Sequence, residues 1–216
     1  MLSPLYLCQC PGMSAVNMEW SGFLSTSDPL FQLSAFFMVF NPVFWNLTAQ
    51  GEYRLNLISG CVAGHKKFAC IVLGIVIFTL GIYRDVLFHE MMSKQPVYPA
   101  DETLCMYIGW GLIAIGQVLN LAVFYRLGLF GVYLGDYFGI FVLDAPVTAF
   151  PYNVTADPQY WGSALTFLGD ALRCRSPAGV AQTCILVVTY KCASLFESKM
   201  LHELYAEKSR REKKGK

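Results

Sequence analysis

Three long runs of apolar residues constrain this chain more than any other feature of its sequence. Residues 104–125 contain no charged side chain, residues 178–196 contain a single lysine, and residues 68–88 are charged only near their end. A helix that crosses the hydrocarbon core of a bilayer needs about 20 predominantly apolar residues. Each run is long enough, and we therefore predict three membrane-spanning helices.

The composition agrees with a membrane protein. Of the 216 residues, 55% are hydrophobic and 14% are charged, whereas about 25% are charged in an average soluble domain. A fourth apolar run, residues 29–47, contains Asn41 and Pro42. Because proline removes a backbone donor and bends a helix, this run either spans the membrane or only enters it. The sequence thus predicts an all-α, multi-span helical bundle of about four to five membrane helices, one of them a candidate re-entrant segment.

The distribution of charge divides the chain into three parts. We expect a variable N-terminal tail over residues 1–27, a membrane domain over residues 28–200 and a basic tail over residues 201–216. With 16 Lys and Arg against 15 Asp and Glu, the overall charge indicates no nucleic-acid partner. The basic tail is typical of a cytosolic segment. The eight cysteines form no CxxC pair, and we expect no bound metal.

Residues 126–177 differ from the apolar runs, because aromatic, glycine, proline and aspartate residues lie close together there. The segments LGDYFGIF (134–141), TAFPYN (148–153) and DPQYWGS (157–163) place aromatic side chains beside acids and turn residues. Such a mixture suits a ligand site at the membrane surface. It is equally typical of the aromatic belt of many membrane proteins, and physical reasoning alone leaves both interpretations open.

The order of these segments resembles that of the phosphatidylethanolamine N-methyltransferase family, in the phospholipid methyltransferase superfamily that also includes the isoprenylcysteine carboxyl methyltransferases. The similarity covers nearly the whole chain after the N-terminal tail and includes FNPVFWN (40–46) and LFES (195–198). The resemblance implies transfer of methyl groups from S-adenosylmethionine to phosphatidylethanolamine, or to its mono- and dimethylated forms, giving phosphatidylcholine. It also implies a multi-pass protein of the endoplasmic reticulum membrane, with the mitochondrial membrane as a further location.

The resemblance assigns cofactor residues to two elements of this chain, each with a departure. The Gly-x-Gly element of the family falls on Ala114, Ile115 and Gly116, which keep only the second glycine. The paired glutamates of the family fall on Glu197 and Ser198, so that the second carboxylate is missing. A backbone contact to a cofactor needs a small residue, and alanine still meets that need.

The DPQYWGS segment resembles the His-Pro-x-Tyr-x-Gly element of the superfamily, with aspartate in the place of histidine. The resemblance implies that Pro158, Tyr160 and Gly162 lie near the cofactor. S-adenosylmethionine carries a sulfonium, an ammonium and two ribose hydroxyls, and it therefore suits carboxylate acceptors and aromatic faces. Glu197 and Tyr160 are residues of these kinds.

Methyl transfer to an amine requires a neutral nitrogen, whereas an ammonium with a lysine-like pKa of about 10.4 is protonated near neutrality. A nearby carboxylate or a dry environment favours loss of that proton. Asp136 and Asp157 are our candidates for the catalytic base, although aspartate also serves in turns and helix caps. Aromatic side chains suit an acceptor that becomes a quaternary cation, and four are candidates for binding it: Tyr137, Phe138, Tyr152 and Trp161.

A single cofactor that contacts both DPQYWGS and Glu197 requires these residues to lie on one membrane face. Residues 160–196 must then enter the membrane and return as a helical hairpin that turns near residues 176–177. A plain count of four spans instead places the segments TAFPYN and DPQYWGS (148–163, the motif loop) on the membrane face opposite the basic tail. The distribution of basic residues slightly favours the hairpin. Asn153 begins an Asn-Val-Thr glycosylation acceptor, which the hairpin keeps away from the lumen.

Three other functions are compatible with the residues alone. They are methylation of the carboxylate of a prenylated protein, reduction with a nicotinamide cofactor, and a non-catalytic role as a membrane scaffold. The FNP and LGDYFGI elements favour the lipid family over the first, and the motif residues contain no basic cluster for a nicotinamide 2′-phosphate. The expected partners are a phospholipid substrate and the membrane, and the sequence leaves the oligomeric state open.

Overall fold

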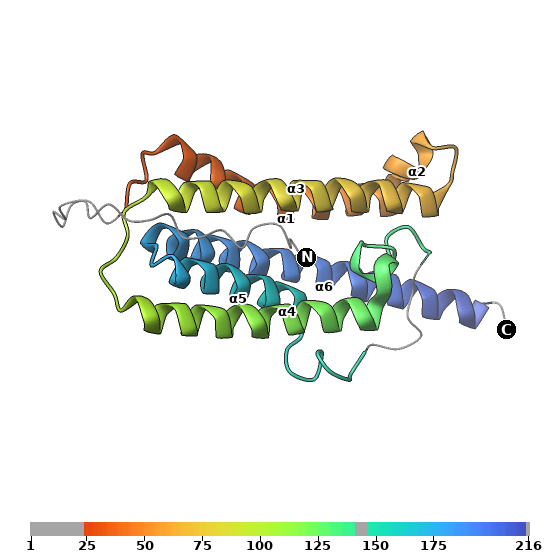
Figure 1. Ribbon diagram of the computed structural model, residues 1–216. Coiled ribbons are helices and arrows are strands. Elements are labelled where there is room, and N and C mark those ends of the chain that lie inside the picture. The colour runs from red at the N-terminus through yellow and green to blue at the C-terminus, as the bar shows by residue number, and fades with distance from the viewer. Residues whose placement is uncertain (1–23, 141–146, 215–216) are drawn as a thin grey trace.

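Long helices make up the computed structural model, which describes residues 24–140 and 147–214 (Figure 1). Over these residues the chain contains helices and no strand, which confirms the predicted all-α class. Most of the expected N-terminal tail lies outside the described residues. In chain order the helices are α1 (Pro29–Leu55), α2 (Leu57–Cys61), α3 (Lys66–Lys94), α4 (Glu102–Val132), α5 (Pro158–Arg173) and α6 (Pro177–Lys214).

Four of these helices are long and apolar enough to cross a membrane: α1, α3, α4 and the part of α6 over Pro177–Met200. The protein is therefore a multi-pass membrane protein, as predicted. The helix α5 has only 16 residues, whereas a full crossing takes about 20. Its length is closer to that of a re-entrant segment than to that of a full membrane span.

Proline does not interrupt α1, and two asparagines near it bind backbone carbonyls of α1 and α3. Pro42 lies in the middle of a continuous helix of 27 residues. The side-chain amide of Asn46 donates to the carbonyl of Pro42 at 3.1 Å. The amide of Asn41 donates to the carbonyl of Leu80 on α3 at 3.0 Å. The sequence left open whether residues 29–47 span the membrane or only enter it, and in the structure they belong to a helix long enough to span it.

Two pairs of glycines bring α4 and α5 into close contact. A β carbon added at Gly116 would lie 2.5 Å from the carbonyl oxygen of Gly162, and one added at Gly109 would lie 2.5 Å from that of Gly169. In each helix the two glycines are about two turns apart and therefore share one face. Small residues at such positions allow membrane helices to approach backbone to backbone.

The helices α5 and α6 form the predicted hairpin. After α5 ends at Arg173, the amide of Ser176 donates to the carbonyl of Ala171 at 2.9 Å, and Pro177 begins α6. Figure 1 shows α5 between α4 and α6, with α6 running back toward the end of the bundle at which α4 finishes. The DPQYWGS segment and Glu197 therefore lie together, as the hairpin requires.

A glycine turns the end of α4 toward the bundle. Gly128 has φ 63° and ψ −176°, a left-handed conformation that favours glycine. The chain then folds back, and Tyr133 and Phe138 pack against Cys70 and Leu73 of α3. This turn brings the LGDYFGI segment, with its aspartate, over the centre of the bundle.

Candidate functional site

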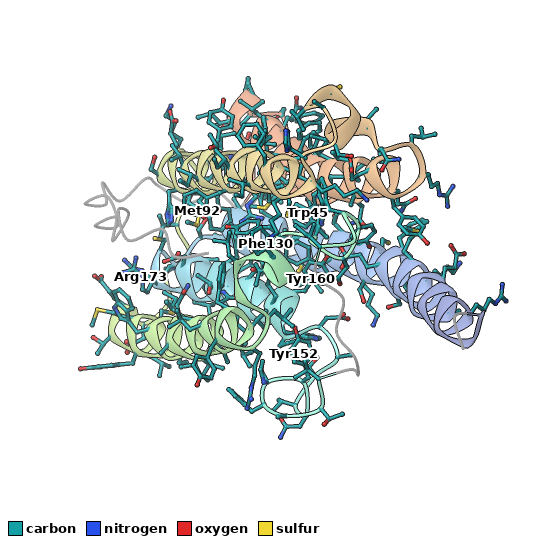
Figure 2. The ribbon with its side chains drawn as sticks, turned by 90° about the vertical axis from the view of Figure 1, so that its right-hand side faces the viewer. Trp45, Met92, Phe130, Tyr152, Tyr160 and Arg173 are labelled. Carbon is teal, nitrogen blue, oxygen red and sulfur yellow. The ribbon has the colours of Figure 1, made fainter. Side chains whose placement is uncertain are left out.

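A cavity of about 250 Å³ lies where α1, α3, α5 and α6 meet the folded-back end of α4. Figure 2 shows Trp45 of α1 and Tyr160 of α5 near the centre of the bundle, with Tyr152 on the loop that leads into α5. The side chains that give the cavity its chemistry are Trp45, Arg84, Asp136, Tyr137, Tyr152, Asp157, Tyr160, Tyr190 and Glu197.

Glu197 is held by donors from two other helices. Its Oε1 accepts hydrogen bonds from the indole Nε1 of Trp45 at 3.3 Å, from Nδ2 of Asn46 at 3.0 Å and from the hydroxyl of Tyr160. All three bonds end on Oε1, so none of them uses Oε2. The carboxylate is thereby fixed in orientation, with its second oxygen left to accept a bond from a ligand.

Aromatic rings form one wall of the cavity. Tyr160 stacks on Tyr190 with ring centroids 4.6 Å apart, and the ring centroids of Trp45 and Tyr190 are 6.3 Å apart. The hydroxyl of Tyr190 accepts a hydrogen bond from Nη1 of Arg84 at 3.0 Å. The wall thus presents π faces, which suit a cation, and ends at a guanidinium group.

Asp157 stands at the start of α5 and faces α6. Its Oδ2 accepts a hydrogen bond from the hydroxyl of Ser194 at 2.6 Å. Although Asp157 occupies the N-cap position, its side chain makes no capping bond to α5. The ordinary role of aspartate at a helix start is therefore not the one that it takes here.

Asp136 is the acid with the least support from neighbouring side chains. Its Oδ1 is buried and has no hydrogen-bond partner among the described residues. Burial raises the pKa of this carboxyl from 3.8 to about 7, because a charged carboxylate is poorly solvated there. Burial, with the charges of Asp136 and Asp157 adding, also raises the pKa of Tyr152 to about 12. With a pKa of about 7, Asp136 changes its protonation near neutral pH.

Seven of the residues predicted from the sequence line this one cavity. They come from the folded-back end of α4, the motif loop, α5 and α6, which are separated in the sequence. The seven are Asp136, Tyr137, Tyr152, Asp157, Pro158, Tyr160 and Glu197.

The predicted Gly-x-Gly element lies outside the cavity. Ala114 and Ile115 are exposed on the outer surface of α4. Gly116 is buried against Gly162 and Thr166 of α5, so that its open side is filled by protein. In this structure the glycine serves helix packing, and a cofactor contact at that position would require α4 and α5 to separate.

Four other predicted residues also lie outside the cavity. Gly162 belongs to the contact between α4 and α5, and Phe138 is buried in the core against α3. Trp161 is 51% exposed, as expected of a tryptophan at a membrane interface. Ser198 is exposed, and its hydroxyl donates to the carbonyl of Ser194 in its own helix at 2.7 Å.

Sequence reasoning missed Trp45, Asn46, Arg84 and Tyr190 as site residues. Two signals for them were present. FNPVFWN contains both donors to Glu197, and Arg84 is a charge inside an apolar run, which in membrane helices marks function. Tyr190 gave no such signal, because a tyrosine near the end of a membrane helix is common.

Comparison with known proteins adds independent findings. The family model described as phospholipid methyltransferase matches residues 104–208. The chain is 42% identical over 197 residues to the phosphatidyl-N-methylethanolamine N-methyltransferase of Emericella nidulans. The aligned residues cover 91% of this chain and 95% of that protein. The enzyme with the same name from Saccharomyces cerevisiae is 39% identical over 185 residues, or 85% of this chain and 88% of that protein.

A mammalian relative carries a different name. The phosphatidylethanolamine N-methyltransferase of Rattus norvegicus is 38% identical over 196 residues, which cover 90% of this chain and 98% of that protein. These matches include α1 and α3, which lie outside the part matched by the family model. No solved structure matches the chain significantly.

Proposed function

Because this chain belongs to the phospholipid methyltransferase family, we propose that it transfers methyl groups from S-adenosylmethionine to the amine of ethanolamine phospholipids, with phosphatidylcholine as the end product. The observation that carries the proposal is the cavity in which Asp136, Asp157, Tyr160 and Glu197 meet. It combines acids for a cationic donor and an ammonium acceptor with aromatic faces for the positive charge of the product.

The residues of the cavity fit S-adenosylmethionine. Two carboxylate oxygens can accept hydrogen bonds from a ligand. They are the buried Oδ1 of Asp136, which has no partner among the described residues, and Oε2 of Glu197, because the three bonds to that carboxylate end on Oε1. When bound, S-adenosylmethionine supplies an electrophilic methyl group on a sulfonium. Glu197 and Tyr160, with Pro158, are the residues that we propose hold it, and the ring faces of Trp45 and Tyr190 suit its positive charge.

The acceptor ammonium must lose a proton before its nitrogen can attack. Asp136 is the proposed base, because its raised pKa makes it a stronger proton acceptor than an ordinary aspartate and its Oδ1 has no hydrogen-bond partner in the part of the chain that the structure describes. The proton would pass from nitrogen to Oδ1. Asp157, held by Ser194, is the second candidate base, and Tyr137 and Tyr152 are proposed to surround the acceptor nitrogen.

The names of the relatives support a lipid acceptor. Those of Emericella nidulans and Saccharomyces cerevisiae are named for phosphatidyl-N-methylethanolamine, and that of Rattus norvegicus for phosphatidylethanolamine. We therefore include the unmethylated and the methylated headgroups as acceptors. The same names favour this function over carboxyl methylation of a prenylated protein and over nicotinamide-dependent reduction.

We propose the endoplasmic reticulum membrane as the location, with the mitochondrial membrane as the alternative, on the family resemblance. The basic residues at the end of α6 support a cytosolic position for that end of the bundle. The cavity, which opens among elements of the same end, would then receive a water-soluble donor from the cytosol.

The direct test uses membranes from cells that express the protein and membranes from the same cells without it. Both are incubated with methyl-labelled S-adenosylmethionine, and the extracted lipids are separated by chromatography. We expect label in mono-, di- or trimethylated ethanolamine phospholipids only where the protein is present. Label confined to protein methyl esters, or absent from lipid, contradicts the proposal.

A further inference from the structure

Arg84 is a buried cation on the wall of the cavity that the proposed proton transfer does not use. We propose that Arg84 binds the phosphodiester group of the acceptor phospholipid. This inference rests on the proposed function and adds to it the residue that recognises the anionic part of the headgroup.

The position of Arg84 indicates a function. It lies about three turns before the end of α3, and only 8% of its surface is exposed. A cation inside a membrane-spanning helix is costly, and such residues usually face an interior cavity or an ion partner. Ile77, Gly81 and Arg84 share one face of α3, and all three line the cavity.

Surrounding groups fix the guanidinium without using all of its donors. Nε and Nη2 donate to Oδ1 of Asp85 at 3.1 and 2.9 Å, and Nη1 donates to the hydroxyl of Tyr190. The ring of Phe167 covers one face, with its centroid 4.7 Å from Cζ. A guanidinium has five N–H donors, and the three bonds made within the described residues leave two of them for a ligand. A fixed arginine is the side chain best suited to a phosphate group.

The arrangement of charge in the cavity matches a zwitterion. Arg84 is linked to Tyr190, Tyr190 stacks on Tyr160, and Tyr160 donates to Glu197. This chain of contacts separates the cation from an acid of the same cavity. An ethanolamine headgroup likewise carries a phosphodiester anion and an ammonium, separated by a short linker. Binding of the anion at Arg84 would direct the amine toward the acids.

Every methylation state of the headgroup has the same phosphodiester, whereas its nitrogen changes at each step. Binding of the phosphodiester by Arg84 would therefore be the same for every methylation state of the acceptor. S-adenosylmethionine also carries an anion, its carboxylate, and Arg84 is chemically able to bind that group instead. The two sources are separated by measuring the apparent KM for the lipid and for the donor independently.

The first arm uses variants. Arg84→Gln combined with Asp85→Asn removes the cation without leaving Asp85 as an unpaired buried charge, and Arg84→Lys keeps the charge but loses the planar fork. Lys94→Gln is the matched control, because Lys94 is an exposed cation on the same helix that pairs with Glu90. We expect the double variant to raise the KM for the lipid about 10- to 100-fold, with Arg84→Lys intermediate and Lys94→Gln unchanged. The KM for S-adenosylmethionine should stay within about twofold in all of them.

The second arm starts from the wild-type protein, so its first comparison does not depend on whether the variants fold. The wild-type protein is given an ethanolamine phospholipid and its neutral phosphotriester analogue, in which one phosphate oxygen is methylated. We expect the diester to be preferred about 10- to 100-fold in kcat/KM, and the double variant to lose this preference. A purely structural role for Arg84 would leave the preference intact.

Several results would overturn the inference. They are a rise in the KM for S-adenosylmethionine with an unchanged KM for the lipid, no change in either, or equal use of diester and triester by the wild-type protein. A wild-type protein that methylates no ethanolamine lipid at all would instead refute the proposed function, before any change at Arg84 is measured.

Discussion

The hydroxyl of Tyr160 on α5 donates a hydrogen bond to Oε1 of Glu197 on α6. This bond joins the DPQYWGS segment to the end of the last spanning helix, and it exists because α5 and α6 form a hairpin. Trp45 and Asn46 of α1 donate to the same oxygen. A single carboxylate thus ties together three helices around the cavity.

Replacing Glu197 with Gln should weaken binding of S-adenosylmethionine. The amide oxygen can still accept from Trp45, Asn46 and Tyr160, so the fold is kept while the negative charge is lost. We expect the apparent KM for the donor to rise about 10- to 100-fold. Glu203→Gln, which changes an exposed acid of the same helix, is the control. An unchanged donor KM in a folded Glu197 variant would reject this role.

Asn46→Leu should have a smaller effect of the same kind. The substitution removes one donor to Glu197 at similar side-chain volume and leaves those of Trp45 and Tyr160. A bond to a charged group contributes about 1.5 kcal/mol or more, so the donor KM should rise about 10-fold. Thr48→Val is the control, because its hydroxyl binds only the carbonyl of Phe44 in its own helix. Equal kinetics for the two variants would show that the amide does not position Glu197.

The pH dependence of methyl transfer should report Asp136. Below a pKa of about 7 the carboxyl is protonated and cannot accept a proton, and above that value it is an available base. Activity should therefore rise with pH through about 7. Asp136→Asn should remove this limb and lower kcat about 100- to 10,000-fold, the usual contribution of a general base. A variant that keeps the same pH profile would exclude Asp136 and leave Asp157 as the candidate.

Substitutions at the glycines of α4 should separate helix packing from cofactor binding. A β carbon at Gly116 meets the carbonyl of Gly162 at 2.5 Å, whereas one at Gly111 has open space around it. Overpacking typically costs about 1 to 3 kcal/mol. Gly116→Ala should therefore lower the thermal stability of the protein in detergent, and Gly111→Ala should not. If the donor KM rises in Gly116→Ala while stability is unchanged, the cofactor role predicted from the sequence is correct instead.

The fold was largely predictable because its strongest signal is local. A run of apolar residues without charge specifies a membrane helix by itself, and the predicted spans correspond to α1, α3, α4 and α6. The hairpin was predictable from the resemblance and the single-cofactor argument, with slight support from the distribution of basic residues. No local sequence pattern shows whether a short segment such as α5 enters the bundle as a helix and pairs with the next span or forms a loop before that span.

Some of the site residues predicted from the sequence line the cavity, and the position of the others outside it has a physical explanation. Asp136 and Tyr160 lie in motifs that mix acids with aromatic residues, so residue type indicated them, whereas Glu197 was assigned from the family resemblance. Gly116 was assigned to a cofactor because the Gly-x-Gly element of the family falls on residues 114–116. A glycine permits close approach to any neighbour, and the sequence does not say whether that neighbour is a ligand or a helix. The matching spacing of Gly109 and Gly116 with Gly162 and Gly169 was the available sign of helix packing.

Topology can be tested with introduced cysteines. Figure 1 shows the end of α6 at the end of the bundle at which α4 finishes, the start of α4 at the other end, and the loop over residues 147–157 beside the second half of α4. In a background without native cysteines, Val154→Cys and Arg210→Cys should react with an impermeant thiol reagent from the same side of sealed membranes. Thr103→Cys should react only from the opposite side, and Asn153 should carry no glycan. Labelling of positions 154 and 210 from opposite sides would refute the hairpin in the membrane.

The most direct measurement is a competition between acceptors with purified protein. Protein in nanodiscs that contain phosphatidylethanolamine and its monomethyl form is mixed with a prenylated peptide that ends in a free carboxylate, and methyl-labelled S-adenosylmethionine is added. We predict label on the lipid nitrogen, dependent on Glu197 and Asp136, and none on the peptide. Label on the peptide carboxylate, or lipid label that survives both Glu197→Gln and Asp136→Asn at wild-type rate, would contradict methyl transfer to phospholipid in this cavity.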